Sequence, residues 1–94
     1  MSDQRYPFQQ QLGEVVYTVR LARRDLAARG ECDSPRKPNP EIRVRRGLPP
    51  IEVMEVLIHE AMHALHWQIA EEVVLESAIQ IADMLDKAGV GARD

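Results

Sequence analysis

The chain has 94 residues, a formal net charge of −3 and 45% hydrophobic residues. A chain of this length forms one domain with a modest core, which a metal ion or a partner chain would help to fix. Its single cysteine excludes an intrachain disulfide, and no apolar run reaches the length of a membrane-spanning helix. We therefore expect one domain over residues 1–94 that acts in a reducing cytoplasm, or in the host cytoplasm if a phage encodes it.

The N-terminal residues are polar and lack the apolar segment of a secretory signal. They include a run of glutamines, and we predict a flexible tail over residues 1–13. Residues 14–22 are rich in β-branched side chains that alternate with others, which predicts a strand with one buried face. Residues 23–30 predict either a helical turn or an extension of this strand, ending at Gly30.

The middle of the chain predicts a loop and a second strand. Residues 31–40 contain three prolines together with Asp, Ser and Asn, a composition typical of a loop. Residues 41–45 alternate again between apolar and charged side chains. The inward residues are Ile42 and Val44, and the outward residues are Arg43 and Arg45. Because outward charges are typical of unpaired strands, we expect residues 41–45 to lie at a sheet edge.

Two helices are predicted in the second half. The first runs from Pro50 to His66, since proline suits a helix start. The second runs from Ala70 to Ala88, with Gly89 as a plausible C-cap. A connection of a few residues requires the helices to form an antiparallel hairpin. The predicted fold class is therefore α+β, with short antiparallel or mixed strands followed by a two-helix hairpin.

The first predicted helix carries the sequence His59-Glu60-Ala61-Met62-His63. Residues i and i+4 of a helix share one face and lie about 6 Å apart along the axis, so both imidazoles can bind one ion. Glu60 lies about 100° round the helix from His59, where its carboxylate can reach a metal-bound water. This is the HExxH arrangement of metallopeptidases. It predicts one Zn²⁺ ion whose activated water attacks a peptide carbonyl, with Glu60 as general base.

A catalytic zinc ion usually has three protein ligands, and the third is expected on the second helix. If the hairpin turns between residues 68 and 69, residues at equal distances before and after the turn lie side by side. Position 61, midway between the two histidines, is then level with Glu76. Glu72 lies one helical turn nearer the connection. We predict Glu76 as the third ligand and Glu72 as the alternative, and the one that does not bind can orient a histidine. Both also belong to a polar stripe opposite the apolar face of this helix, and such a stripe is usually just exposed to solvent.

Two other side chains are candidates for smaller roles. His66 lies about 10 Å along the helix axis from His59, too far to bind the same ion. We expect it to lie behind the ligands or toward the substrate, or to be an ordinary exposed histidine. Cys32 either reaches the metal from its loop or is a small buried side chain without a role there.

The motif, the charged strand before it and the acidic helix after it resemble the zincin superfamily of metallopeptidases. The resemblance covers about residues 30–88. The chain is similar to the minimal gluzincin-like core of SprT-like and ImmA/IrrE-type proteins, and it more closely resembles small metallopeptidases of phages and bacteria. It implies that the strand before the motif helix aligns an extended peptide substrate, a role that falls on Ile42, Arg43, Val44 and Arg45. It also implies an acidic ligand on the following helix. The thermolysin-like Asn-Glu-x-x-Ser-Asp segment and the third histidine of metzincins are absent.

Two other functions compete with a peptidase. One is a non-catalytic interaction module that a metal stabilises, possible also as a homo-oligomer. The other is a nucleic-acid-associated accessory protein, since residues 1–50 carry ten Lys/Arg against six Asp/Glu, or +4, and residues 51–94 carry two against nine, or −7. Its binding residues would be Arg36, Lys37, Arg43, Arg45 and Arg46. No aromatic residues are interleaved among them to stack on bases.

Overall fold

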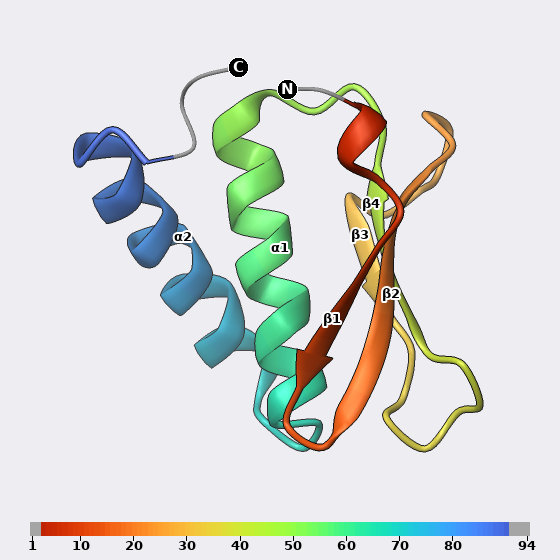
Figure 1. Ribbon diagram of the computed structural model, residues 1–94. Coiled ribbons are helices and arrows are strands. Elements are labelled where there is room, and N and C mark those ends of the chain that lie inside the picture. Colours follow the sequence, from red (N-terminus) through yellow and green to blue (C-terminus); the bar gives the residue numbers. More distant parts are fainter. Residues whose placement is uncertain (1–2, 91–94) are drawn as a thin grey trace.

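The computed structural model describes residues 3–90 and places a four-stranded sheet beside two helices (Figure 1). In chain order the elements are a 3-10 turn (Asp3–Arg5), β1 (Phe8–Leu12), β2 (Val15–Ala22), β3 (Gly30–Cys32), β4 (Glu41–Arg45), α1 (Pro50–Leu65) and α2 (Glu71–Lys87). The α+β class is confirmed, and both helices begin and end within one residue of their predicted bounds. Within residues 3–90, no helix is both long and apolar enough to cross a membrane.

The strands lie in the order β1-β2-β4-β3. β2 and β4 are parallel, whereas β1 and β3 pair antiparallel with their neighbours and form the two edges. β4 is therefore an interior strand, and the prediction of an edge strand at residues 41–45 is wrong. Because both sides of its backbone are already paired, β4 cannot receive an added strand. The substrate-aligning role predicted for Ile42, Arg43, Val44 and Arg45 is corrected for the same reason.

Two other segments differ from the prediction. Residues 8–12 of the predicted tail form β1, which pairs with β2 from Phe8 opposite Val19 to Leu12 opposite Val15. The turn between them uses Gly13 at a φ of 65°, a conformation that favours glycine. Residues 30–32 form β3, where a loop was expected from residue 31 onward. Residues 1 and 2 of the predicted tail lie outside the described residues.

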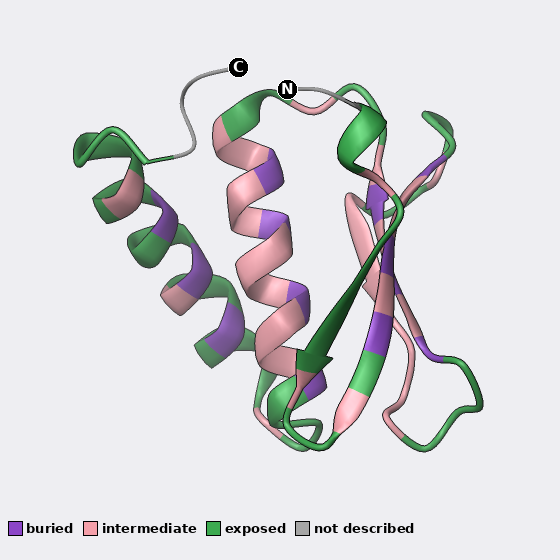
Figure 2. Cartoon of the chain, in the orientation of Figure 1, coloured by how far each residue is buried: buried purple, intermediate pink, exposed green. Residues whose placement is uncertain are grey.

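α1 lies between the sheet and α2 (Figure 1). Its buried stripe recurs at intervals of three and four residues and consists of Val53, Val56, Glu60 and Ala64. This stripe packs on the inward side chains of the two central strands, which are Tyr17, Val19, Ile42 and Val44. α2 turns its own buried residues, Val74, Ala78 and Ala82, toward α1 (Figure 2). Glu60 is thus the one charged member of the two buried stripes.

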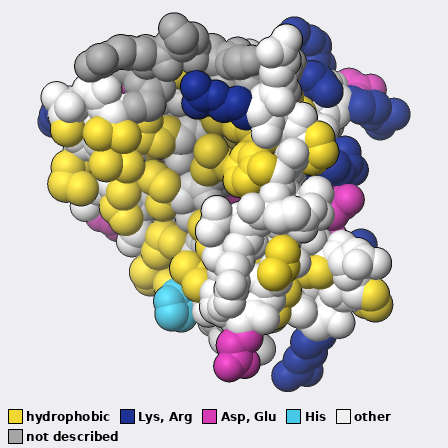
Figure 3. Space-filling view, in the orientation of Figure 1, with side chains coloured by type: hydrophobic (Ala, Val, Ile, Leu, Met, Phe, Trp, Pro, Cys, Tyr) yellow, Lys and Arg dark blue, Asp and Glu magenta, His cyan; other side chains and the backbone are white. Residues whose placement is uncertain are grey.

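The rest of α2 leaves large apolar side chains exposed. They are Val73, Leu75, Ile79, Ile81 and Met84. Figure 3 shows hydrophobic side chains gathered over the helices and most of the visible Lys and Arg side chains on the sheet side. An apolar surface of this kind is compatible with the predicted homo-oligomer, which stays a prediction.

Arg43 fastens the edge strand β3 to β4. Its guanidinium donates hydrogen bonds to Glu31 at 3.0 Å, to Asp33 at 2.6 Å and to Glu41 at 3.0 Å. The Asp33 carboxylate also accepts the backbone N–H of Glu41 at 2.9 Å. The hydrogen bond from Arg43 holds the pKa of Asp33 at about 2. Because the Asp33 side chain is only 8% exposed, solvent screens this pair weakly.

Acid should therefore weaken the fold through Asp33. Its pKa in the folded protein, about 2, lies below the ordinary value of 3.8. The stabilisation is consequently present above about pH 4 and is lost as the pH falls through about 2. The shift corresponds to about 2 kcal/mol of unfolding free energy. We expect the unfolding free energy of Asp33→Asn in urea to be lower by about this amount at neutral pH. On acidification, the unfolding free energy of the variant should fall less than that of the wild type.

Glu31→Gln is the matched control, because it removes a second carboxylate from the same guanidinium. The Glu31 side chain is 43% exposed, so this variant should lose less than about 1 kcal/mol. Both variants are measured in the metal-free protein. Equal losses in the two would show that burial of Asp33 does not strengthen its pair with Arg43.

Candidate metal centre

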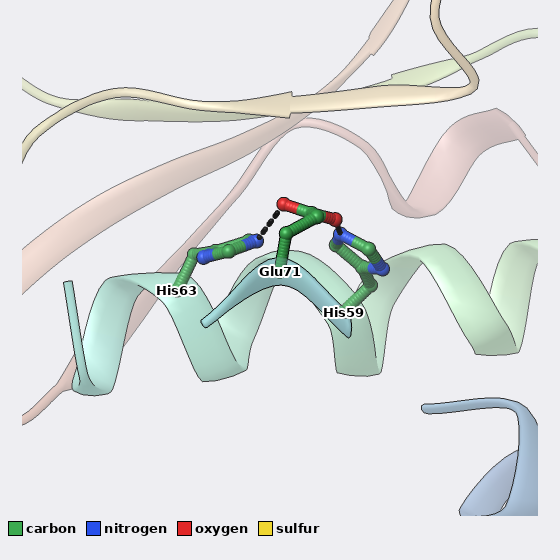
Figure 4. Close-up of side chains that lie close together, drawn as sticks. All are labelled: His59, His63 and Glu71. Carbon is green, nitrogen blue, oxygen red and sulfur yellow. Dashed lines mark hydrogen bonds and ion pairs between the residues drawn. The ribbon is translucent and has the colours of Figure 1, made fainter. Parts of the chain in front are cut away.

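His59 and His63 lie one turn apart on α1 and direct their Nε2 atoms toward the carboxylate of Glu71 (Figure 4). Oε1 of Glu71 is 2.7 Å from Nε2 of His59, and Oε2 is 2.9 Å from Nε2 of His63. The two imidazoles are 18% and 16% exposed, and the Glu71 side chain is 66% exposed. Among the described residues, these three form a group whose donor atoms all lie within 4.8 Å of one another.

Rotation about the α2 axis explains why Glu71 lies at this point. The buried stripe of α2 begins at Val74. Glu71 precedes Val74 by three residues, so it lies on the same face, toward α1. Glu72 and Glu76 are each two residues from Val74, which is about 200° round the helix. Both are exposed on the outer side, and the predicted acidic partner is corrected from Glu76, or Glu72, to Glu71.

The donor set fits a zinc ion. Two imidazole nitrogens and one carboxylate oxygen form a common catalytic zinc set that leaves a fourth position open. Tetrahedral ligands at zinc stand about 3.3 Å apart, given bonds of about 2.0–2.2 Å. At 2.7 Å and 2.9 Å the carboxylate oxygens lie at hydrogen-bond distance from the two nitrogens, and the exposed Glu71 side chain can shift to bind an ion. Calcium and magnesium prefer oxygen ligands, so the imidazoles favour zinc or a similar transition metal.

Glu60 lies beside this group but faces the sheet. It is 8% exposed, at a position of the α1 stripe where an aliphatic side chain would pack. The pKa of the Glu60 carboxyl is raised to about 7, mainly by burial and also by the negative charges of Glu71 and Glu31, while Arg43 opposes the rise. A bound cation would lower this pKa again, because it favours the carboxylate. A buried carboxyl with a perturbed pKa beside a cleft is typical of functional sites.

Gly30 lets β3 lie close against α1, chiefly at Val56. A Cβ atom at this position of β3 would collide with Cγ1 of Val56 and would lie 3.2 Å from Oε2 of Glu60. The backbone of β3 can therefore approach α1 closely only because residue 30 has no side chain. β3 and α1 form two facing walls with the Glu60 carboxylate between them.

A cleft of about 600 Å³ lies between these walls. Besides the metal group and Glu60, its lining consists of Ala28, Arg29, Gly30, Cys32, Val56 and Trp67. His66 is exposed at the end of α1 and is not among the lining residues. Cys32 lines the cleft but does not belong to the donor group. Burial and the charge of Glu60 raise the pKa of the Cys32 thiol to about 11, so the thiol stays protonated near neutral pH.

The outer edge of β3 borders this cleft. Within residues 3–90, β3 pairs with β4 alone. The N–H of Asp33 donates to the carbonyl of Glu41, and the N–H of Arg45 donates to the carbonyl of Arg29. Odd-numbered residues thus turn their backbone toward β4, and antiparallel alternation turns the N–H and C=O groups of Gly30 and Cys32 outward. β3 has only three residues, too few for an alternating pattern in the sequence to predict it.

Comparisons of this chain with models of protein families, with curated proteins and with solved structures found no match. The resemblance to zincins therefore stays a prediction. What supports a function is the geometry of the described residues, above all the three converging donors and the buried carboxylate next to them.

We expect the protein to bind one zinc ion at this group. His63→Ala and Glu71→Gln should each weaken binding by more than about 100-fold, because losing a direct ligand exceeds the 10–100-fold loss typical of an outer partner. Glu76→Gln changes the same chemistry on the same helix and should bind zinc as the wild type does. Calorimetric titration with Zn²⁺ measures all three, and equal affinities for Glu71→Gln and Glu76→Gln would contradict the site.

Proposed function

We propose that this protein is a zinc-dependent peptidase that hydrolyses an extended peptide lying along β3. The observation that carries the proposal is the convergence of His59, His63 and Glu71 beside the buried Glu60, in a cleft bordered by an open strand edge. Donors, base and substrate edge lie within one cleft, which is what peptide hydrolysis requires.

Each side chain has a defined task. His59, His63 and Glu71 would hold the metal, which supplies a water of lowered pKa and polarises the substrate carbonyl when bound. Glu60 takes a proton from the attacking water while the water oxygen bonds to the carbonyl carbon. The C–N bond then breaks, and Glu60 returns the proton to the leaving amine. Glu60 suits this task because its carboxyl lines the same cleft as the three donors.

The backbone of β3 supplies the substrate site. Gly30 and Cys32 turn their N–H and C=O groups outward, and a peptide strand can pair with both residues. β3 thus takes the substrate-aligning role that the sequence suggested for β4, whose backbone is paired on both sides. Main-chain pairing of this kind gives affinity for any extended peptide, and the cleft side chains then decide which peptides fit.

Glu60→Gln should separate metal binding from catalysis. Because the amide keeps the shape of the side chain but cannot take a proton, zinc affinity should stay close to that of the wild type. Cleavage of unstructured peptides, followed by mass spectrometry, should fall by about 10²–10⁴-fold. Glu72→Gln, on the outer side of α2, is the control and should cleave as the wild type does. Full activity in Glu60→Gln would rule out Glu60 as the base.

Substrate pairing with β3 should have a period of two. N-methylation of a substrate amide that faces β3 removes a hydrogen bond, whereas methylation of the next amide, which faces away, does not. Peptides methylated at successive positions should therefore alternate between weak and strong competition with a cleaved reporter peptide. Inhibition without this alternation would contradict strand addition at β3.

The two alternative functions differ in what they require. A structural zinc site is usually closed by four protein ligands, whereas three donors converge among the described residues. This favours the peptidase over a metal-stabilised interaction module. For nucleic acid, Arg43 is already engaged by three carboxylates, and Arg45 donates to the carbonyl of Leu26. Nucleic-acid binding therefore stays a prediction.

A further inference from the structure

Trp67 stands beside the candidate metal centre without belonging to it. It lies in the connection between α1 and α2, four residues after His63 and four before Glu71. Its side chain is 43% exposed and lines the cleft. Water contact with a large aromatic ring is unfavourable, so an exposed tryptophan in a concave site is typical of a ligand-binding surface.

The rest of the cleft is apolar apart from the site itself. Its other neutral lining residues are Ala28, Gly30, Cys32 and Val56. Arg29 is the remaining charged lining residue, and its guanidinium pairs with Glu52 at 3.1 Å and with Glu55 at 3.7 Å on α1. Its charge is therefore already compensated before a substrate arrives.

Apart from the metal group and Glu60, Arg29 is the one charged residue that lines the described cleft, and it is already paired. The rest of the lining therefore offers no uncompensated charge that would select an acidic or a basic substrate side chain. Selection is left to apolar contact, and Trp67 is the largest apolar side chain among the lining residues.

A strand paired with β3 would bring side chains to this surface. Successive side chains of a strand point to opposite faces. Cys32 packs on the α1 side of the sheet, and the absent side chain of Gly30 faces Val56 and Glu60 on the same side. Every second substrate side chain would therefore point to the α1 side of the sheet, where the cleft lined by Trp67 lies.

We propose that Trp67 determines specificity, selecting extended peptides with a large apolar side chain beside the bond to be cleaved. This inference rests on the proposed peptidase function, which it deepens by naming the substrate class. Apolar contact of this kind discriminates by about 10–100-fold over alanine, which corresponds to about 1.4–2.7 kcal/mol.

The test uses zinc-loaded protein and a peptide series that differs at one position, occupied by Phe, Leu, Ala, Asp or Lys. We expect kcat/KM for Phe and Leu to exceed that for Ala by about 10–100-fold, with Asp and Lys no better than Ala. Trp67→Ala should remove the preference, so that kcat/KM for the Phe and Leu peptides falls to that for the Ala peptide. Trp67→Phe should retain most of the preference. Met84→Ala, which truncates a side chain 60% exposed on α2, is the control and should change nothing.

Binding to zinc-loaded Glu60→Gln separates this inference from the proposed function. Calorimetry with the same peptides should give the same order of affinities, lost when Trp67→Ala is added. If no peptide is cleaved but this order holds, catalysis fails and Trp67 recognition stands. If peptides are cleaved or bound with no preference for Phe and Leu, or the preference survives in Trp67→Ala, Trp67 does not determine specificity.

Discussion

The carboxylate of Glu71 lies between two imidazoles, and this contact joins the two helices where they leave their connection. Elsewhere α2 is buried only through a valine and two alanines, which give a short and narrow contact with α1. The rotation of α2 about its own axis therefore decides whether Glu71 reaches the two histidines, and the contact of Glu71 with the histidines in turn helps to hold that rotation. If α2 turned by the angle of one residue, about 100°, Glu71 would leave the histidines and Val74 would leave α1. Because the Glu71 side chain is exposed, solvent screens its bonds, and a metal ion would make this junction much stronger.

The helices could be predicted from sequence because their signals are local. Proline at the start of α1, a short connection and regular apolar spacing fixed their bounds within one residue. The acidic partner was missed because the prediction compared heights along the hairpin and not rotation about its axis. Glu76 was chosen as level with the histidines, yet it lies on the outer side of α2. The useful signal was the apolar stripe through Val74 and Ala78, which continues back to Glu71 at the same helical spacing.

The sheet edges could not be predicted because pairing is not local. Residues 41–45 alternate clearly, and their outward arginines resemble those of an edge strand. In the fold, β4 is interior because β2 pairs with one side of it and β3 with the other. The charge of Arg43 is compensated there by Glu31, Asp33 and Glu41. The true edge, β3, is three residues long and begins at a glycine. A strand this short is recognisable only once Arg43 and the backbone of β4 are seen to hold it.

The buried position of the Glu60 carboxyl bears on whether the site does more than bind a metal ion. Joining α2 to α1 needs His59, His63 and Glu71, and it needs nothing from position 60. That position belongs to the sheet-facing stripe of α1, where an aliphatic side chain would pack and a buried carboxyl costs stability. β3 packs directly over this carboxyl, at a glycine that the close approach to Val56 requires. The metal junction does not use the Glu60 carboxyl, and proton transfer beside a bound metal is the task that would require it.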